Sequence, residues 1–236
     1  MTSRIITLLS DFGLRDPYVA EMKAVVTAIS ADARTIDISH LIEKFNIRMG
    51  AFVLASAASY FPEGTIHVAV VDPGVGTKRR PLLLETRNAL FIGPDNGLLI
   101  PAAQRDGIQH AYAITNSKLM LPKVSFTFHG RDVFAPAAAH LVNGTLPANF
   151  GDEISDYVVP SFARLELKAG QLRGEVLHID EFGNIISNIT STDLERAGVR
   201  TRSTLFLRLH NKAHRTLFVE TYGDVSAKSA LALVGS

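Results

Sequence analysis

The sequence feature that most constrains the fold is an apolar strand that stops abruptly at a polar loop. Residues 65–70, Thr-Ile-His-Val-Ala-Val, are rich in β-branched side chains and predict a strand. The segment Asp72-Pro73-Gly74 ends it, because Pro73 cannot donate to a ladder and Gly74 permits unusual backbone angles. Arg79 follows in the same loop. The pattern therefore places a carboxylate and a positively charged arginine at the carboxyl end of a strand, where open α/β sheets bind ligands.

The same arrangement, an apolar strand followed by polar side chains, is predicted at other places in the chain. The polar groups concerned are Asp11, Ser39-His40, Asp95-Asn96, and His129 with Arg131 and Asp132. Helices are predicted between the strands, over about 17–29, 47–60, 98–106 and 133–142. Alternation of strands and helices is typical of a largely parallel sheet. The carboxylates, the histidine and the arginine are thus expected to converge at one edge of that sheet and to form a polar pocket.

Local signals refine these elements. We expect Asp16, Asn46 and Asp132 to cap the first, second and fourth helices. The first helix has an apolar face made of Val19, Met22, Val26 and Ile29. Residues 82–86 and 89–92 predict a hairpin, and His67 inside its strand is expected to be a packed histidine.

The second part of the chain has a different pattern of predicted elements. Short strands are predicted over 175–180, 184–190, 203–210, 215–222 and 229–234, with one helix near 193–197 that a capping box of Thr192 and Glu195 begins. The predicted fold class is α/β. A largely parallel α/β/α sandwich domain (1–150) is followed by a linker (151–170) and a small antiparallel β-barrel domain (171–236).

Composition excludes several classes of function. The chain has 236 residues with 24 basic and 23 acidic side chains, so its net charge of +1 offers no field for nucleic acid or an anionic membrane. It has no cysteine, which removes disulfides, thiolate metal sites and a cysteine nucleophile. No apolar run approaches the roughly 18 residues of a membrane helix, and we expect a cytoplasmic protein. Dinucleotide-binding, P-loop, zinc-protease and serine-hydrolase motifs are also absent from the sequence.

Each candidate residue also has a purely structural interpretation. Asp132 is better explained as a helix cap, while His40, Asn96 and Asn184 could equally be turn residues. Asp11 and Asp72 are the stronger functional candidates. An acid that follows an apolar strand directly is costly to bury without a partner.

Six short segments, taken together and in order, resemble one known family over essentially the whole chain. They are Ser10-Asp11-Phe12-Gly13, residues 37–40, residues 70–76, residues 93–97, Phe128-His129-Gly130-Arg131-Asp132, and residues 179–184. The family is that of the S-adenosyl-L-methionine (SAM) hydroxide adenosyltransferases, which are related to the fluorinase and chlorinase. The resemblance implies hydrolysis of SAM to adenosine and L-methionine without a cofactor or metal. It also implies a homotrimer with active sites between subunits.

The resemblance assigns roles to individual residues. Asp72, Arg79 and His129 match the catalytic triad that positions and deprotonates water, and the sequence leaves open which of them is the final base. The implied substrate-binding residues are Asp11 for the ribose hydroxyls, Asp180 for the methionine ammonium, Phe182 and Asn184 for the nucleoside, and also Phe128 and Ser236. Sequences of this family continue past the strand ending at Val234. We therefore expect that the small domain is truncated at its C-terminus and that substrate affinity falls as a result.

Three other functions remain as alternatives. A SAM-dependent halogenase needs a dry anion pocket, and in those relatives an aromatic residue stands at the position of Asp72. A metal-dependent nucleoside hydrolase could use Asp11, Asp16, Asp72 and Asp95 as oxygen ligands. The third alternative is a protein that binds SAM or adenosine without catalysis.

Overall fold

The computed structural model describes residues 4–162, 165–168, 171–210 and 212–235. The chain divides into two compact units between residues 161 and 162. The division lies within the stretch 151–170 from which we expected a linker.

The first unit alternates strands and helices in the predicted order. Its elements are β1 (Ile5–Ser10), α1 (Tyr18–Ile29), β2 (Arg34–Ser39), α2 (Ile47–Ala58), β3 (Thr65–Val70), β4 (Pro81–Thr86), β5 (Ala89–Pro94), α3 (Ile100–Asp106), β6 (Ile108–Ala113), a π-helical turn (Gly130–Phe134) and α4 (Ala135–Val142). Two short 3₁₀ turns, Ser117–Leu119 and Pro147–Asn149, flank the last helical segment.

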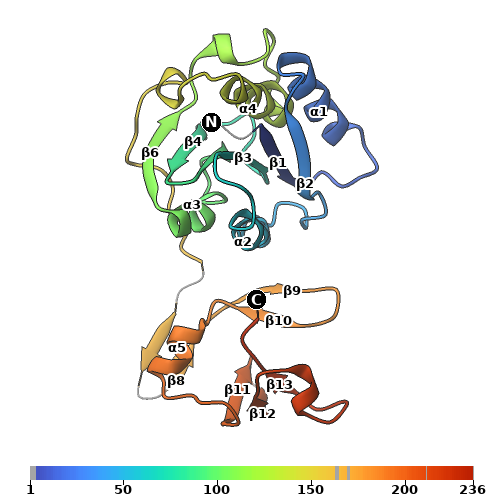
Figure 1. Ribbon diagram of the computed structural model, residues 1–236, viewed down its shortest axis with the longest axis vertical. Coiled ribbons are helices and arrows are strands. Elements are labelled where there is room, and N and C mark those ends of the chain that lie inside the picture. Colours follow the sequence, from blue (N-terminus) through green and yellow to red (C-terminus); the bar gives the residue numbers. More distant parts are fainter. Residues whose placement is uncertain (1–3, 163–164, 169–170, 211, 236) are drawn as a thin grey trace. The chain divides into compact units, whose positions relative to one another are not determined.

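The six strands of this unit form one mixed sheet in the order β2-β1-β3-β5-β4-β6. Neighbours among β2, β1, β3 and β5 are parallel, whereas β4 runs antiparallel to both β5 and β6. Helices α1 and α4 pack together on one face of the sheet, and α2 and α3 pack together on the other (Figure 1). The prediction of a parallel-rich sheet between helices is therefore confirmed, as is the β4–β5 hairpin.

Strand β6 was not predicted. Its sequence, Ile-Gln-His-Ala-Tyr-Ala, has only one β-branched residue, and its first half is partly or fully exposed. It becomes a strand because it pairs antiparallel with β4 along the edge of the sheet. Tertiary pairing thus overrides a weak local preference.

The core of the first unit lies on both sides of β3, whose six residues are all buried. The predicted apolar face of α1 is confirmed, since Val19, Met22 and Val26 are buried there and Ile29 packs against the core. His67 is only 1% exposed. Its ring stacks on Phe91 at 4.9 Å between centroids, and its Nδ1 lies 2.7 Å from Thr7 Oγ1, so the prediction of a packed histidine is confirmed.

Two of the three predicted helix caps are wrong. Asn46 does cap α2, because its side chain accepts a hydrogen bond from Met49 N at 2.9 Å. Helix α1 instead begins after Pro17, which occupies the N-cap position without a side-chain bond. Asp132 lies inside the π-helical turn, where its carboxylate binds groups other than a helix terminus.

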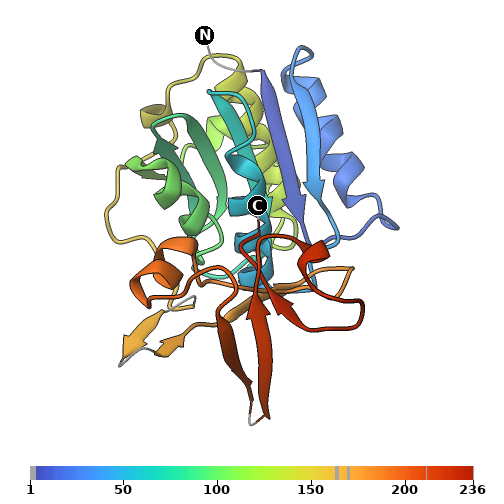
Figure 2. The ribbon, with the colours of Figure 1, turned by 60° about the horizontal axis from the view of Figure 1, so that its bottom comes forward.

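The second unit contains short strands and one short helix. Its elements are β7 (Glu166–Lys168), β8 (Gln171–Arg173), β9 (Val176–Ile179), β10 (Ile185–Ser187), α5 (Ser191–Arg196), β11 (Thr204–Leu209), β12 (Lys212–Phe218), a 3₁₀ turn (Tyr222–Asp224) and β13 (Leu231–Ala232). The pairs β7–β8, β9–β10 and β11–β12 are antiparallel, and β13 joins β12 in parallel (Figure 2). The described strands therefore form small, mainly antiparallel sheets, and closure into a barrel remains a prediction.

The capping box of α5 lies two residues before the predicted one. Thr190 accepts from Asp193 N, and the Asp193 carboxylate accepts from Thr190 N at 2.9 Å. Both Thr190 and Thr192 are followed three residues later by an acid, so the sequence did not distinguish the two registers. Within the described residues, no helix is both long and apolar enough to span a bilayer.

Candidate active site

The carboxyl ends of β1, β2, β3 and β5 meet at one edge of the sheet because these strands are mutually parallel. Asp11, His40, Asp72 and Asp95 follow these strand ends directly or within two residues. The antiparallel partner β4 begins at the same edge, where Pro81 pairs with Pro94. The loop before β4, which carries Arg79, is therefore brought to the same place.

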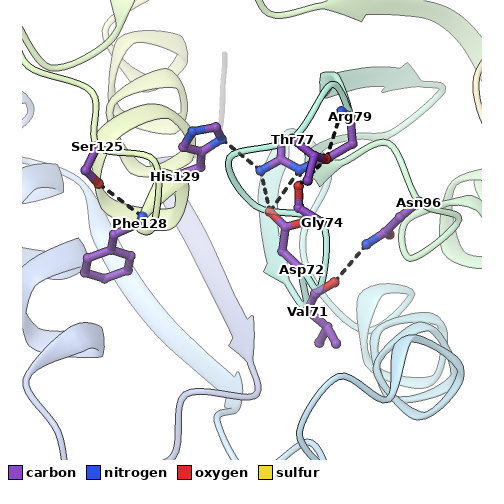
Figure 3. Close-up of polar contacts among 9 residues, drawn as sticks. All are labelled: Val71, Asp72, Gly74, Thr77, Arg79, Asn96, Ser125, Phe128 and His129. Atoms are coloured by element: carbon purple, nitrogen blue, oxygen red, sulfur yellow. Dashed lines mark hydrogen bonds and ion pairs between the residues drawn. The ribbon is translucent and has the colours of Figure 1, made fainter.

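Asp72, Arg79 and His129 form one connected group (Figure 3). Arg79 Nε lies 3.0 and 2.9 Å from the two carboxylate oxygens of Asp72, and Arg79 Nη2 also donates to Asp72 Oδ2. The same Nη2 lies 2.9 Å from His129 Nδ1. Only 6% of the Asp72 side chain and 9% of the Arg79 side chain are exposed. The structure thus brings the three residues together as a nearly buried ion pair in contact with an imidazole.

The contact with Arg79 defines the protonation of His129. A guanidinium has donors but no acceptor, so His129 Nδ1 accepts this hydrogen bond and carries no proton. Burial lowers the pKa of His129 below its ordinary value, and the Arg79 charge lowers it further, while Asp72 and Asp132 act in the opposite direction. His129 is therefore a neutral imidazole at pH 7.

The β3–β4 loop is organised to present Arg79. Thr77 Oγ1 donates to Gly74 O at 2.7 Å and accepts from Arg79 N at 3.4 Å (Figure 3). The Arg79 guanidinium also lies over the Phe134 ring, 5.3 Å from its centroid. Arg79 Nη1 is buried, and no described residue accepts a hydrogen bond from it. One donor of the triad is consequently available to a ligand or water.

His129 does not follow a strand, contrary to expectation. Residues 124–128 form a loop, and His129 immediately precedes the π-helical turn Gly130–Phe134. π-Helical turns of this kind occur frequently at functional sites. The loop also packs against the one carrying Arg79, because a Cβ on Gly76 would lie 2.3 Å from Phe126 O.

Asp11 is held by the loop that follows β2. Its Oδ2 accepts from Phe45 N at 2.9 Å, and its backbone carbonyl accepts a hydrogen bond from Lys44 Nζ. Phe45 adopts a positive φ of 63°, a conformation that is unusual for a residue other than glycine. The strain is localised where the backbone meets Asp11, which is consistent with a functional position.

The remaining strand-end residues have structural partners. The carboxylate of Asp95 accepts from Arg80 Nη2 at 2.8 Å and from Val158 N at 2.7 Å. Asn96 Nδ2 donates to Val71 O at 2.9 Å and so fixes the residue before Asp72 (Figure 3). His40 Nδ1 lies 2.7 Å from Ser10 Oγ, next to Asp11.

Phe128 lies in a cluster of aromatic side chains. Its ring is buried and packs edge-on against Phe12 at 5.5 Å and Tyr18 at 5.3 Å between centroids. Arg131 lies over the same ring at 5.0 Å. This aromatic cluster anchors the loop that carries His129.

The second unit carries the other implied substrate residues on the turn between β9 and β10. Asp180 Oδ1 accepts from Phe182 N and Asn184 N, both at 2.9 Å, and its Oδ2 accepts from Asn184 Nδ2 at 2.7 Å. Hydrogen bonds from Asn184 are the main cause that lowers the pKa of Asp180, so it is a carboxylate at neutral pH. Phe182 is 93% exposed. Ser236 lies outside the described residues.

The four aspartates of the metal-site hypothesis do not gather as ligands. Asp72 and Asp95 are each paired with an arginine, and Asp11 binds a backbone N–H. Among the described residues there is no group of three or more His, Asp or Glu side chains arranged to hold a metal ion.

Sequence reasoning missed the residues that support the triad, namely Thr77 and Ser125. Each is a hydroxyl residue close in sequence to a group that it binds, which is the pattern of local side-chain turns. That signal is too common to single out a functional position.

Comparisons with known proteins give matches over nearly the whole chain. The sequence matches the family models described as SAM hydroxide adenosyltransferase N-terminal domain, over residues 6–151, and C-terminal domain, over residues 174–236. The "(R)-S-adenosyl-L-methionine hydrolase" of Salinispora tropica is 38% identical over 98% of this chain and 86% of that protein. A "Fluorinase" of Actinoplanes sp. is 29% identical over 87% of this chain and 78% of that protein. A crystal structure of an uncharacterized conserved protein from Thermotoga maritima superposes with a TM-score of 0.91, at 36% identity, over 97% of this chain and 88% of the other.

Proposed function

The chain belongs to the SAM hydroxide adenosyltransferase family, and from this premise we propose that it hydrolyses S-adenosyl-L-methionine to adenosine and L-methionine. The observation that carries the proposal is the buried contact of Asp72, Arg79 and His129. This group supplies what attack by water requires, namely a carboxylate acceptor and a fixed cation.

The reaction is a displacement at the ribose C5′. Water forms the new C5′–O bond while the C5′–S bond breaks, and the sulfonium leaves as a neutral thioether with its electron pair. The leaving group needs no proton, so no general acid is required. The nucleophile must instead be held in line and lose one proton to the protein or to solvent.

We assign the role of proton acceptor to Asp72. Arg79 cannot accept a proton, and the unprotonated Nδ1 of His129 is already occupied by Arg79. A carboxylate offers about four lone-pair sites. The contacts from Arg79 to Asp72 number three, which leaves capacity for a water molecule. The free Nη1 of Arg79 can orient that water or stabilise the hydroxide that forms.

The proposed binding roles follow the family resemblance. Asp11 would accept hydrogen bonds from the ribose hydroxyls, since a carboxylate binds a vicinal diol through both oxygens. Asp180 would bind the methionine ammonium, and the exposed ring of Phe182 would contact the nucleoside together with Asn184. Phe128 and Ser236 complete the proposed set of substrate-binding residues.

The proposal extends to the assembly. A homotrimer with active sites between subunits would let the second unit of one copy serve the first unit of another. In the same proposal the second unit closes into a barrel, the enzyme is cytoplasmic and needs no cofactor, and it has no nucleic-acid or membrane partner. Sedimentation equilibrium tests the trimer, and a monomer that is fully active would contradict it.

Asp72 distinguishes this proposal from the halogenase alternative. A halide that occupied the place of the attacking water would lie against the Asp72 carboxylate, and this repulsion is strong in a nearly buried site. The arginine pairing of Asp72 and Asp95 likewise disfavours the metal-dependent nucleoside hydrolase.

The experiment that tests the function is a chromatographic assay with purified protein and SAM, with and without a chelator. We expect adenosine and methionine in equal amounts in both samples. Adenine as the product, or loss of activity with chelator, would support the nucleoside hydrolase. Tight SAM binding without turnover would support the non-catalytic binder.

A further inference from the structure

A buried carboxylate, Asp132, lies on the π-helical turn three residues after His129. Asp132 is fully buried, and its oxygens accept hydrogen bonds from Arg131 Nε at 2.7 Å, Ser125 N at 2.8 Å and Ser125 Oγ at 2.6 Å. Arg131 is held in turn by Glu21 at 2.7 Å. Burial by itself would raise the pKa of Asp132, but the bonds from Arg131 and Ser125 lower it below its ordinary value. The group is therefore a buried anion with two of its three partners on Ser125.

Ser125 links Asp132 to the segment that carries His129. Its Oγ accepts a hydrogen bond from Phe128 N at 3.1 Å, which fixes the residue immediately before His129 (Figure 3). The backbone of Ser125 also raises the pKa of the His129 side chain, as expected for two groups that lie close together. The position of His129 therefore depends on Ser125, which Asp132 holds in place.

The orientation of the His129 ring decides whether the hydrogen bond from Arg79 to His129 can form. Arg79 Nη2 can donate to His129 only while Nδ1 faces it without a proton. A rotation of the imidazole would present a carbon or an N–H to the guanidinium. Without this contact, Arg79 would no longer be held in the position from which it donates to Asp72.

We propose that Ser125, anchored by Asp132, is a positioning residue that holds His129 in the orientation required for the Asp72–Arg79–His129 group to activate water. This inference rests on the proposed function for its effect on turnover. Its effect on the His129 ring does not depend on that function.

The primary variant is Ser125→Ala, which removes the hydroxyl and retains the backbone. We expect kcat to fall about tenfold, because misplacing a catalytic group by a fraction of an ångström has effects of this order. KM should change by less than about twofold, because His129 acts in the reaction step rather than in ground-state binding. Ser125→Thr keeps the hydroxyl and should restore kcat to within about twofold of wild type.

The chain offers a closely matched control. Thr86 Oγ1 donates to the Asp106 carboxylate at 2.5 Å and accepts from Ala89 N at 3.2 Å. Ser125 makes the same two kinds of contact: its hydroxyl donates to a carboxylate, Asp132, and accepts from the backbone N–H three residues later, that of Phe128. Thr86 ends β4, at the edge of the sheet opposite the triad. Thr86→Ala should lower stability in urea unfolding as Ser125→Ala does, and kcat should stay within about twofold of wild type.

Nitrogen-15 NMR of the His129 ring supplies a readout that does not require substrate. In the wild type we expect the pattern of a neutral imidazole with Nδ1 unprotonated. In Ser125→Ala we expect averaged ring shifts, while Thr86→Ala keeps the wild-type pattern. Wild-type kcat and ring shifts in Ser125→Ala would overturn the inference, and so would an equal loss of kcat in Thr86→Ala. A wild-type protein that does not consume SAM would refute the proposed function, and the ring shifts would still decide the role of Ser125.

Discussion

At the scale of single residues, the Asp72–Arg79 pair combines two functions that usually conflict. Breaking a buried ion pair by removing one partner leaves an uncompensated charge, so both residues are needed for stability. In the proposed reaction, the same pair would also provide the proton acceptor and a hydrogen-bond donor for the attacking water. Any test of the chemistry must therefore separate loss of catalysis from loss of folding.

The variant Asp72→Asn, compared with the control variant Asp95→Asn, separates loss of catalysis from loss of folding. Asn cannot accept the proton, so we expect kcat to fall by about 10²- to 10⁴-fold with SAM affinity changed by less than about threefold. Asp95→Asn breaks a comparable pair with Arg80 and should cost stability while kcat stays within about threefold. Turnover is measured by chromatography and affinity by calorimetry on folded protein. An effect of Asp72→Asn mainly on affinity would contradict its assignment as base.

His67 gives a prediction on pH and stability. Burial lowers the pKa of His67 from 6.5 to about 4 in the folded protein. Between these two values the unfolded chain binds the proton and the folded chain does not, so stability falls as pH falls through this window. In His67→Gln, which can still bind Thr7, the loss of unfolding free energy between pH 7 and pH 5 should be about 2 kcal/mol smaller than in wild type. Urea unfolding at the two pH values measures the difference, and an unchanged pH dependence would contradict it.

At the scale of elements, the site depends on two loops that are packed against each other rather than on one strand end. The β3–β4 loop brings Arg79, and the segment before α4 brings His129. Their contact leaves no room at Gly76, whose φ is +76° and whose added Cβ would lie 2.3 Å from Phe126 O. The spacing of the loops therefore sets the Arg79–His129 distance.

Gly76→Ala tests this coupling, and Gly144→Ala separates clash from backbone strain. Gly144 also has a positive φ, +89°, with nothing within 4 Å of an added Cβ. We expect Gly144→Ala to cost about 1 kcal/mol of stability through backbone strain and to keep full turnover. Gly76→Ala should lower kcat about tenfold or more, because the loops must move apart. Equal turnover in the two variants would show that loop spacing does not matter.

At the scale of the whole molecule, the proposal draws on both units. Phe182 is almost fully exposed on the β9–β10 turn, so its removal should leave the unfolding midpoint unchanged. Phe182→Ala is nevertheless expected to raise KM for SAM about tenfold, because an aromatic contact with the nucleoside would be lost. Phe206→Ala, another exposed aromatic position on β11, is the control and should leave KM unchanged. A KM for Phe182→Ala equal to the wild-type value would remove Phe182 from the binding site.

The sequence predicted those parts of the fold that depend on hydrophobic periodicity. Strand β3, helix α1 and the β4–β5 hairpin are where the patterns put them. Strand β6 was missed because its pairing with β4 decides its conformation. The wrong cap at Asp132 has a different cause: the carboxylate that looked like a helix cap binds Ser125 instead, seven residues away.

For the candidate site, the sequence named the candidate residues but did not predict the contacts between them. Asp72 and Arg79 could be anticipated as neighbours, since they share one loop. That His129 contacts Arg79, fifty residues earlier, depends on the packing of two loops and on which ring nitrogen faces the guanidinium. No local pattern encodes such a contact. The strand-end pattern predicted only that these side chains gather at one edge of the sheet, and the resemblance to a family grouped the three residues as a triad.

The measurement that tests the central claim most directly is the fate of oxygen from water. The protein is incubated with SAM in chloride-free buffer made with ¹⁸O-labelled water, and the experiment is repeated with chloride. The account predicts adenosine with the label at its 5′ oxygen, in the same amount in both buffers. A 5′-halogenated nucleoside in the chloride sample, or adenosine without label, would contradict the claim that water bound at Asp72 attacks C5′.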